Sequence, residues 1–217
     1  MKPVGVVLCC DDFSGRTGFQ EAFLVLSALK KQGVKSLCIT ACDIQLDVIK
    51  EFFYKKEKED FVTATESSLL SLSEIISLKE SIPENLSGLI FPGGFGLIRR
   101  LTTLETDGSD YTIDEELFTL MQEIHKQSKP LGFISQAAIL APKLAGAEVR
   151  VTLGTDIDRA ELLDAIGAEP VLCPADDIVI NLEMKIVSTP GLLSEQSEGE
   201  AALGIDKLVR CVTEWIE

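Results

Sequence analysis

The chain contains a single histidine, His125, among its 217 residues, and basic residues are scarce beside acidic ones. One histidine leaves little choice for Ser–His or Cys–His catalysis, because the base must lie within hydrogen-bond reach of the nucleophile. Twenty lysines and arginines against 35 aspartates and glutamates give a net charge of −15. A surface of this charge repels phosphate backbones and anionic lipid head groups, so we expect neither nucleic acid nor a membrane as a partner.

Long hydrophobic runs are missing as well. Residues 4–8 form a short apolar segment that Asp11 and Asp12 soon interrupt, which is unlike a secretory leader or a membrane span. We see no linker, repeat or low-complexity block. The sequence therefore predicts a cytoplasmic protein with one domain over residues 1–217, long enough to bury its own core. We expect no cofactor.

Six cysteines are present, and in the cytosol they are expected to be reduced thiols rather than a disulfide framework. Cys9 and Cys10 lie at the end of the first strand and Cys38 and Cys42 near the end of the second, so their thiolates could meet at a metal. This spacing matches no usual structural zinc pattern, and we predict no metal site. Cys10 could instead serve as a nucleophile.

Apolar runs alternate with helical patterns along the whole chain. Residues 60–82 are hard to interpret beyond a possible strand or hairpin within 69–78, and residues 99–111 read as a polar connection. The alternation predicts an α/β fold, a doubly wound and mostly parallel sheet with helices on both faces, followed by a late β-hairpin and a C-terminal helix. Strands are predicted at 4–10, 35–40, 86–91, 131–134, 149–153, 178–182 and 185–188, and helices at 19–31, 46–58, 112–127, 137–144, 158–167 and 195–216.

The most informative local feature is the abrupt passage from a strand into a helix at Ser135. Such elbows hold a nucleophile at the rim of an α/β sheet, beyond the carboxyl ends of the strands where ligands bind. Gly93 and Gly94 follow a neighbouring strand, and their N–H groups together with the amide of Gln136 could form an oxyanion hole. Alternatively, the glycines form only a tight turn and Ser135 is a helix N-cap.

Seven motifs along the chain occur in an order and spacing that resemble the ElbB family (enhancing-lycopene-biosynthesis or sigma cross-reacting proteins) of the ThiJ/PfpI superfamily. The resemblance covers nearly the whole chain and is weakest over residues 51–85. The motifs are Gln20-Glu21-Ala22, Phe91-Pro92-Gly93-Gly94-Phe95-Gly96, Lys129-Pro130-Leu131-Gly132-Phe133, Gly154-Thr155-Asp156-Ile157-Asp158, Ala175-Asp176-Asp177-Ile178-Val179, Lys185-Ile186-Val187-Ser188-Thr189-Pro190 and Gly204-Ile205-Asp206-Lys207-Leu208.

The resemblance implies a class I glutamine amidotransferase-like fold and a commonly homodimeric assembly. It places Ser135 where the superfamily carries a reactive cysteine, and Glu21 where it carries the partner carboxylate. The amides of Gly94 and Gln136 would donate hydrogen bonds to a developing oxyanion. We predict that Gly93 and Thr189 also bind the ligand. Some superfamily relatives have a histidine at the position of Gln136. The implied ligand is a small carbonyl or anionic metabolite, and the implied activity is glyoxalase-type, without glutathione.

Serine at this position changes the chemistry. A thiol can be held as a thiolate by an anion hole, whereas an alkyl hydroxyl needs a neighbouring base. Glu21 is a weak base for an alcohol, and it could instead be a carboxylate in the first helical turn that complements the helix dipole. His125 reads as a surface or boundary residue of its helix. Asp158 reads as a helix cap, and Asp156, Asp176 and Asp177 suggest no metal geometry.

Three functional hypotheses remain on the sequence alone. The first is a glyoxalase-like lyase that acts on glyoxal or methylglyoxal at the Ser135 elbow. The second is a protein that keeps the elbow for binding a metabolite, with weak or absent catalysis and an accessory role linked to isoprenoid synthesis. The third, a glutamine amidotransferase, conflicts with the absence of any histidine after the elbow. We favour the second.

Overall fold

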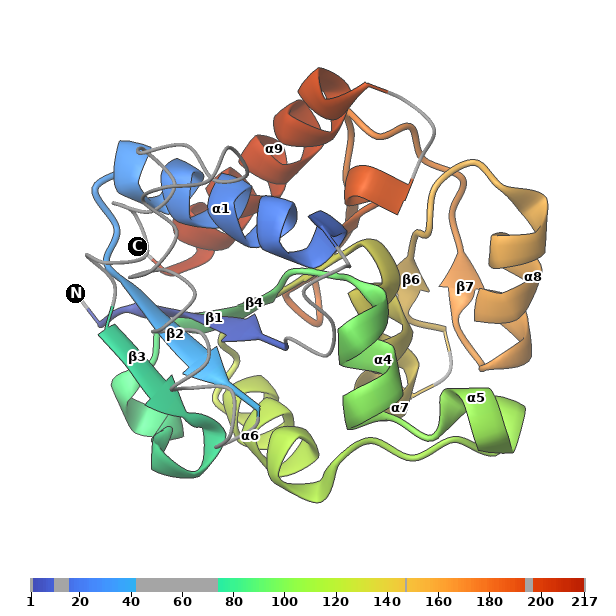
Figure 1. Cartoon of the computed structure of the whole chain (residues 1–217), viewed down its shortest axis with the longest axis horizontal. Helices are drawn as coiled ribbons and strands as arrows, with labels where there is room; N and C mark the ends of the chain where they lie inside the picture. The colour runs from blue at the N-terminus through green and yellow to red at the C-terminus, as the bar shows by residue number, and fades with distance from the viewer. Residues whose placement is uncertain (1, 10–15, 42–73, 147, 194–196, 217) are drawn as a thin grey trace.

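The structure is a computed structural model that describes residues 2–9, 16–41, 74–146, 148–193 and 197–216. Strands and helices alternate along these residues as the sequence predicts (Figure 1). The predicted helix at 46–58 lies outside the described residues. The elements are β1 (Val4–Leu8), α1 (Arg16–Lys31), β2 (Ser36–Thr40), β3 (Glu74–Ser77), η1 (Leu78–Glu80), η2 (Pro83–Asn85), β4 (Gly88–Phe91), α4 (Phe95–Leu101), α5 (Leu104–Asp107), η3 (Gly108–Asp110), α6 (Glu115–Lys126), β5 (Leu131–Ile134), η4 (Ser135–Ile139), α7 (Leu140–Ala145), β6 (Arg150–Val151), α8 (Ile157–Ala165), β7 (Glu169–Pro170), β8 (Val179–Asn181), β9 (Ile186–Thr189), η5 (Gly191–Leu193) and α9 (Glu198–Ile216).

A seven-stranded sheet in the order β3-β2-β1-β4-β5-β9-β8 forms the centre of the molecule. All of its neighbouring strands are parallel except β8 and β9, which form the antiparallel hairpin predicted near the C-terminus. The strand order reverses between β1 and β4, and in open α/β sheets ligands bind at such a point. The fold is therefore the predicted doubly wound α/β fold.

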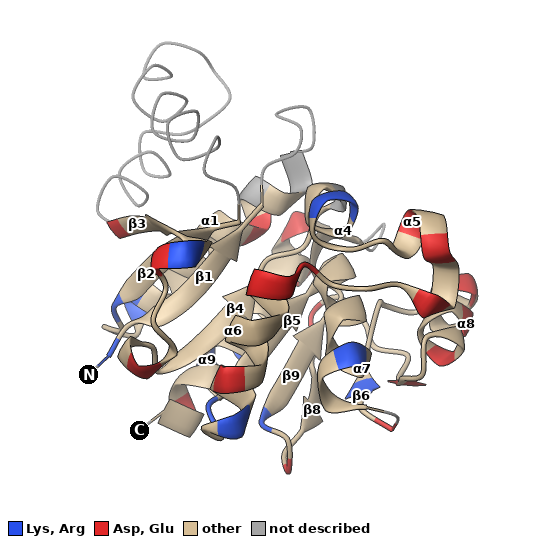
Figure 2. Ribbon diagram, turned by 90° about the horizontal axis from the view of Figure 1, so that it is seen from below, with Lys and Arg blue, Asp and Glu red and all other residues tan. Residues whose placement is uncertain are grey.

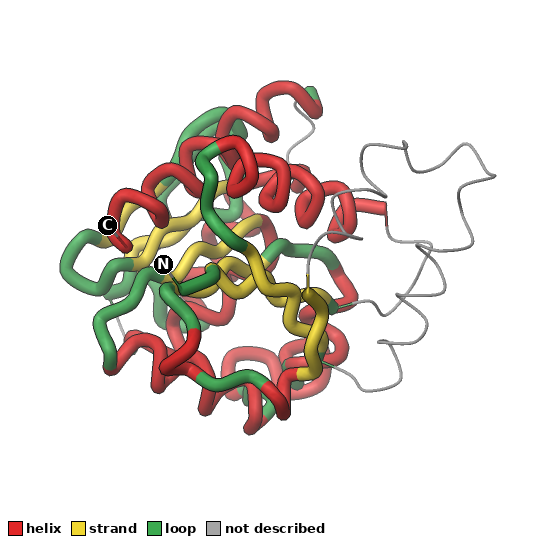
Figure 3. The backbone as a smooth tube through the Cα atoms, turned by 90° about the vertical axis from the view of Figure 1, so that its left-hand side faces the viewer, coloured by secondary structure: helices red, strands yellow, loops and turns green. Residues whose placement is uncertain are grey.

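Helices cover both faces of this sheet, as Figures 1 and 3 show from two sides. Helices α1 and α9 pack on one face, around Val25, Leu29 and Leu208. Helices α4, α6 and α7 pack on the other. In that second core, the rings of Phe91 and Phe133 stack from paired positions of β4 and β5, with centroids 5.1 Å apart. The two strands that carry the glycine turn and the elbow are thereby held together.

Helix α6 begins three residues later than its predicted start at 112, and helix α8 begins one residue earlier than its predicted start at 158. Helix α6 is capped by Asp114, whose Oδ1 accepts the N–H groups of Glu116 and Leu117 at 3.1 Å. Helix α8 is capped by Asp156, so the prediction of Asp158 as the cap was wrong, and Asp158 lies in the first turn. Both caps satisfy amide groups that have no partner within the helix.

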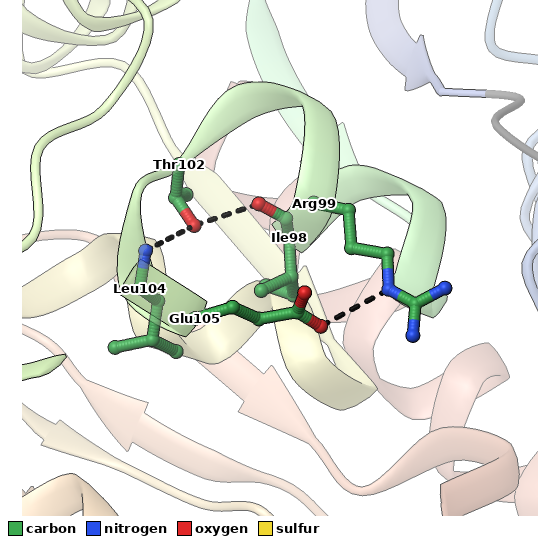
Figure 4. A network of polar contacts seen from close by, with 5 residues as sticks. All are labelled: Ile98, Arg99, Thr102, Leu104 and Glu105. Atoms are coloured by element: carbon green, nitrogen blue, oxygen red, sulfur yellow. Dashed lines mark hydrogen bonds and ion pairs between the residues drawn. The ribbon is translucent and has the colours of Figure 1, made fainter. Parts of the chain in front are cut away.

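The region 99–111 differs from its prediction, because it contains the end of α4, the short helix α5 and the 3₁₀ turn η3 rather than only a connection. Between them, Thr102 Oγ1 donates to the carbonyl of Ile98 at 2.7 Å and accepts the N–H of Leu104 at 3.3 Å. Arg99 Nε pairs with Glu105 Oε1 at 3.0 Å across the same corner (Figure 4). These contacts are local, and no hydrophobic period marks such short helices.

The predicted strand at 149–153 is shorter and lies elsewhere than expected. Only β6 forms, and it pairs with β7 in a separate two-stranded sheet beside the main one, next to α8. We call β6, β7 and α8 the side lobe. Acidic residues are prominent on its helix and on α5 (Figure 2). None of the helices in the described part of the chain is long and apolar enough to cross a membrane.

Candidate functional site

The candidate site lies at the carboxyl end of the central strands. Glu21 comes from α1, which follows β1, and Gly93 follows β4. Ser135 follows β5, and Leu192 belongs to η5, the turn that follows β9. Because β1, β4, β5 and β9 are consecutive neighbours in the sheet, these four residues from distant parts of the chain meet at one edge.

Ser135 occupies a strained elbow. Its φ angle is 58°, a left-handed conformation that costs a residue other than glycine free energy, and such strain gathers at functional sites. The residue is only 1% exposed, and among the described residues its Oγ has no hydrogen-bond partner of regular geometry. Ser135 is the first residue of η4, and its side chain caps no helix, so the N-cap interpretation was wrong.

Glu21 is fully buried at the centre of the site. Its Oε2 accepts the N–H of Gly93 at 2.8 Å, and its Oε1 accepts the N–H of Leu192, also at 2.8 Å. Burial raises the pKa of Glu21 from 4.5 to about 7, against the two amides and the nearby Ser135 side chain, which lower it. The carboxyl group thus joins three segments and titrates near neutral pH.

Glu21 has no role at the helix terminus. Helix α1 begins at Arg16 and has no acidic residue in its first turn, so the interpretation of Glu21 as a complement to the dipole was wrong. The Ser135 hydroxyl is close enough to lower the pKa of Glu21. The facing arrangement of Glu21 and Ser135 that the ElbB resemblance implies is therefore present in the structure.

The glycine turn is pressed against the elbow. A Cβ atom on Gly93 would lie 2.5 Å from Ser135 Cβ and 2.6 Å from the carbonyl oxygen of Ile134, so only glycine fits there. Gly94, with a φ of 115°, is the N-cap of α4, and its backbone lies against Gly18 of α1. The Gly93 amide donates to Glu21 rather than to a ligand.

The other two predicted binding residues lie in different surroundings. Gln136 is the second residue of η4, and its Oε1 is buried without a hydrogen-bond partner in the described part of the chain. Thr189 Oγ1 donates to the carbonyl of Asp177 at 2.8 Å and lies on the α9 side of β9, beside Gly204. The structure thus gives Thr189 a partner within the protein, and its binding of a ligand stays a prediction.

Sequence reasoning missed the turn η5. Its Gly191 has a φ of 56°, and a Cβ atom there would lie 2.5 Å from Glu21 Oε1 and 2.6 Å from Ile134 Cγ2. The next residue, Leu192, supplies the amide that binds Glu21. The only signal in the sequence was the glycine after Pro190, since Leu192 acts through its backbone and not its side chain.

Tyr111 fixes the helical segment behind the elbow. Its hydroxyl donates to the carbonyl of Ile139, at the end of η4, and the ring is 1% exposed with Lys143 Nζ 4.5 Å from its centroid. Burial raises the pKa of Tyr111 well above its usual range.

We expect Tyr111→Phe to lower the free energy of unfolding by about 1–3 kcal/mol, because it leaves the buried Ile139 carbonyl without its donor. Urea unfolding of both proteins measures the effect. An unchanged midpoint would mean that the hydroxyl contributes nothing to holding η4.

His125 lies far from the elbow. It belongs to the last turn of α6, before β5 begins, whereas Ser135 follows the end of β5. A strand of four residues spans roughly 13 Å, so the two side chains sit near opposite ends of β5. His125 Nδ1 is buried without a hydrogen-bond partner, and the residue is in no position to act as a base for Ser135.

The cysteines form no site within the described residues. Cys9 Sγ donates to the carbonyl of Gly96 at 3.4 Å, and Cys38 is buried in β2. Cys10 and Cys42, which the sequence suggested as a nucleophile and a metal ligand, lie outside the described residues. In the described ranges no group of three or more metal-ligating side chains comes together.

Comparison with known proteins gives a relative that decides the family. No family model matches the chain. Human glutamine amidotransferase-like class 1 domain-containing protein 3, mitochondrial, is 30% identical over 216 residues, which cover 94% of this chain and 80% of the human protein. The chain belongs to this amidotransferase-like family. The rat mitochondrial ES1 protein homolog is 29% identical over the same shares of the two chains.

Solved structures support the fold of this amidotransferase-like protein. An isoprenoid biosynthesis protein with an amidotransferase-like domain from Ehrlichia chaffeensis superposes with a TM-score of 0.77 at 22% identity, over the full length of both chains. DJ-1 from Schizosaccharomyces pombe superposes with a TM-score of 0.57 at 15% identity, over 99% of this chain and 94% of that one. The predicted glutamine amidotransferase-like family is confirmed, and the fold is shared with DJ-1.

Proposed function

We propose that this amidotransferase-like protein binds a small carbonyl or anionic metabolite at the Ser135 elbow, with weak or absent turnover. The supporting observation is that Glu21 lies beside the buried Ser135 hydroxyl, whose Oγ has no hydrogen-bond partner of regular geometry among the described residues. Below neutral pH, Glu21 is mostly protonated and cannot accept the serine proton. Above it, a carboxylate remains a weak base for an alkyl hydroxyl. An accessory role linked to isoprenoid synthesis, the homodimer and the cytoplasmic location are further proposals.

A glyoxalase-type lyase is the alternative function. The observation that favours it is the pKa of Glu21, since a group that titrates near 7 is suited to general acid–base catalysis. In this mechanism the Ser135 hydroxyl would add across the aldehyde C=O of glyoxal or methylglyoxal to give a hemiacetal. The Glu21 carboxylate would carry the C1 proton to C2, and water would hydrolyse the resulting ester to release the hydroxy acid and restore Ser135.

Incubation with methylglyoxal separates the two functions. We expect wild-type protein to form no more lactate than Ser135→Ala, while methylglyoxal shifts the Ser135 and Gln136 amide signals of the wild type in NMR spectra. Lactate formation that is lost in both Ser135→Ala and Glu21→Gln would contradict our proposal and support the lyase.

Ser135→Cys tests whether the elbow still suits a thiolate. We expect the new thiol to react with iodoacetamide at pH 7 about tenfold faster than an unperturbed cysteine, because nearby amides and the η4 terminus favour its anion. Peptide mass spectrometry locates the label. Cys173 and Cys211 are controls within the molecule, since burial raises the pKa of each to about 11. Labelling no faster than that of an unperturbed cysteine in a model peptide would show that the anion-stabilising geometry is absent.

A further inference from the structure

The turn η5 is held by two hydrogen bonds to other elements, one at an N–H group and one at a carbonyl group. On one side, the N–H of Leu192 donates to Glu21 Oε1 at 2.8 Å. On the other, the carbonyl of Leu193 accepts Arg159 Nη1, also at 2.8 Å. Within the turn, the N–H of Leu193 donates to the carbonyl of Pro190 at 3.3 Å. The two outer contacts add to this short internal hydrogen bond in orienting the Leu192 amide.

Arg159 differs in exposure and in pairing from three other arginines of the described part of the chain. Arg99, Arg150 and Arg210 are exposed and pair with carboxylates on their own or a neighbouring element. The half-buried Arg159 is in no ion pair within the described part of the chain, although Asp156 and Asp158 stand on the same helix. Asp156 Oδ1 accepts the backbone N–H of Arg159 at 3.0 Å, which fixes the start of α8, while the guanidinium group turns to the backbone of η5.

We propose that Arg159 is a positioning residue for the elbow, which holds η5 so that the Leu192 amide meets Glu21. The guanidinium group suits this task because it offers several fixed donors and keeps its charge at all relevant pH values. Arg159 belongs to α8 of the side lobe, which lies beside the main sheet (Figure 1). Its bond to the Leu193 carbonyl therefore ties that lobe to the turn that follows β9. This role of Arg159 rests on the proposed function, because the position of η5 affects a ligand only if the elbow binds one.

The ionisation of Glu21 reports on this contact. Among the interactions that oppose the burial of Glu21, the Leu192 amide is the largest, followed by the Gly93 amide and Ser135, and no charged side chain is among them. If Arg159 no longer holds η5, the Leu192 amide moves, and the Glu21 carboxylate loses the hydrogen bond that it accepts from this amide. The titration midpoint of Glu21 must then rise.

The experiment compares wild-type protein with Arg159→Met and, as a matched control from the same lobe, Arg150→Met. Glutamate side chains carry ¹³C at the carboxyl carbon, and the Glu21 signal is assigned by its loss in Glu21→Gln. We expect Arg159→Met to raise the Glu21 midpoint by about one pH unit, a tenfold change in its ionisation equilibrium. Hydrogen exchange at the Leu192 amide should become faster in the same variant. Arg150→Met should change neither.

An unchanged midpoint in Arg159→Met would overturn the proposal, as would a raised midpoint with unchanged Leu192 exchange, which would indicate a direct effect of charge. Because both measurements are made without a ligand, they can succeed even if methylglyoxal does not bind. If Arg159→Met fails to fold, Arg159→Gln takes its place with the same expected results, since its shorter side chain stays polar and lacks the charged fork.

Discussion

The stability of wild-type protein should fall by about 3 kcal/mol between pH 4.5 and neutral pH relative to that of Glu21→Gln. The pKa of Glu21 is raised to about 7 in the folded chain from an ordinary 4.5. Between these values the folded protein holds a proton that the unfolded chain releases. The resulting stabilisation is complete below pH 4.5 and is lost as the pH rises through 7. At 1.4 kcal/mol per pH unit, the loss amounts to about 3 kcal/mol.

Glu21→Gln removes this titration, but it also lowers the free energy of unfolding by an amount that does not depend on pH. Its single carbonyl oxygen can accept from Gly93 or from Leu192, and its amide group then faces the other N–H donor. Wild-type protein should therefore be clearly more stable than the variant at pH 5, and the difference should shrink or reverse at pH 8.

Urea unfolding at several pH values gives both stability curves, and their difference cancels the contribution of the other carboxylates. Tyr111→Phe is a useful control, because it removes a buried hydrogen bond and leaves Glu21 unchanged. Its curve should lie below that of wild-type protein by the same amount at each pH. If the curves of wild-type protein and Glu21→Gln are parallel, Glu21 does not titrate near neutral pH.

Much of the site was predictable because its residues carry local signals. Ser135 follows a buried strand and opens a helix on small residues, and such a transition is visible in the sequence. Glu21 was assigned through the ElbB resemblance, and its burial could not be inferred from α1 alone, where it stands among other helix-forming residues. The two glycines after β4 indicated a close approach of backbone, which the structure confirms at Gly93.

The rest of the site could not be predicted, because it depends on contacts that residue type does not indicate. Leu192 and Leu193 act through their amide and carbonyl groups, and any residue other than proline could supply the Leu192 N–H. Arg159 stands in an acidic, exposed helix whose sequence suggests only a surface. Thr189 illustrates the reverse case, since its hydroxyl attracted a functional interpretation and is bonded to the Asp177 carbonyl.

Gly93→Ala should lower the free energy of unfolding by about 3 kcal/mol, at the upper end of the range for an overpacked site. The added methyl group would meet Ser135 Cβ at 2.5 Å and the carbonyl oxygen of Ile134 at 2.6 Å. The second of these atoms belongs to the backbone of β5 and cannot rotate away. Either the turn after β4 moves, or the elbow does.

Gly199→Ala is the matched control for this substitution. It lies in α9, where the nearest atom to an added Cβ is Ser197 Oγ at 3.8 Å, and alanine favours a helix. We expect no loss of stability there, and a gain of up to about 1 kcal/mol. A Gly93→Ala protein as stable as wild-type would show that the turn moves freely. The Gly93 amide could then not hold Glu21 in place, and the Ser135–Glu21 geometry would depend on η5 and Arg159 alone.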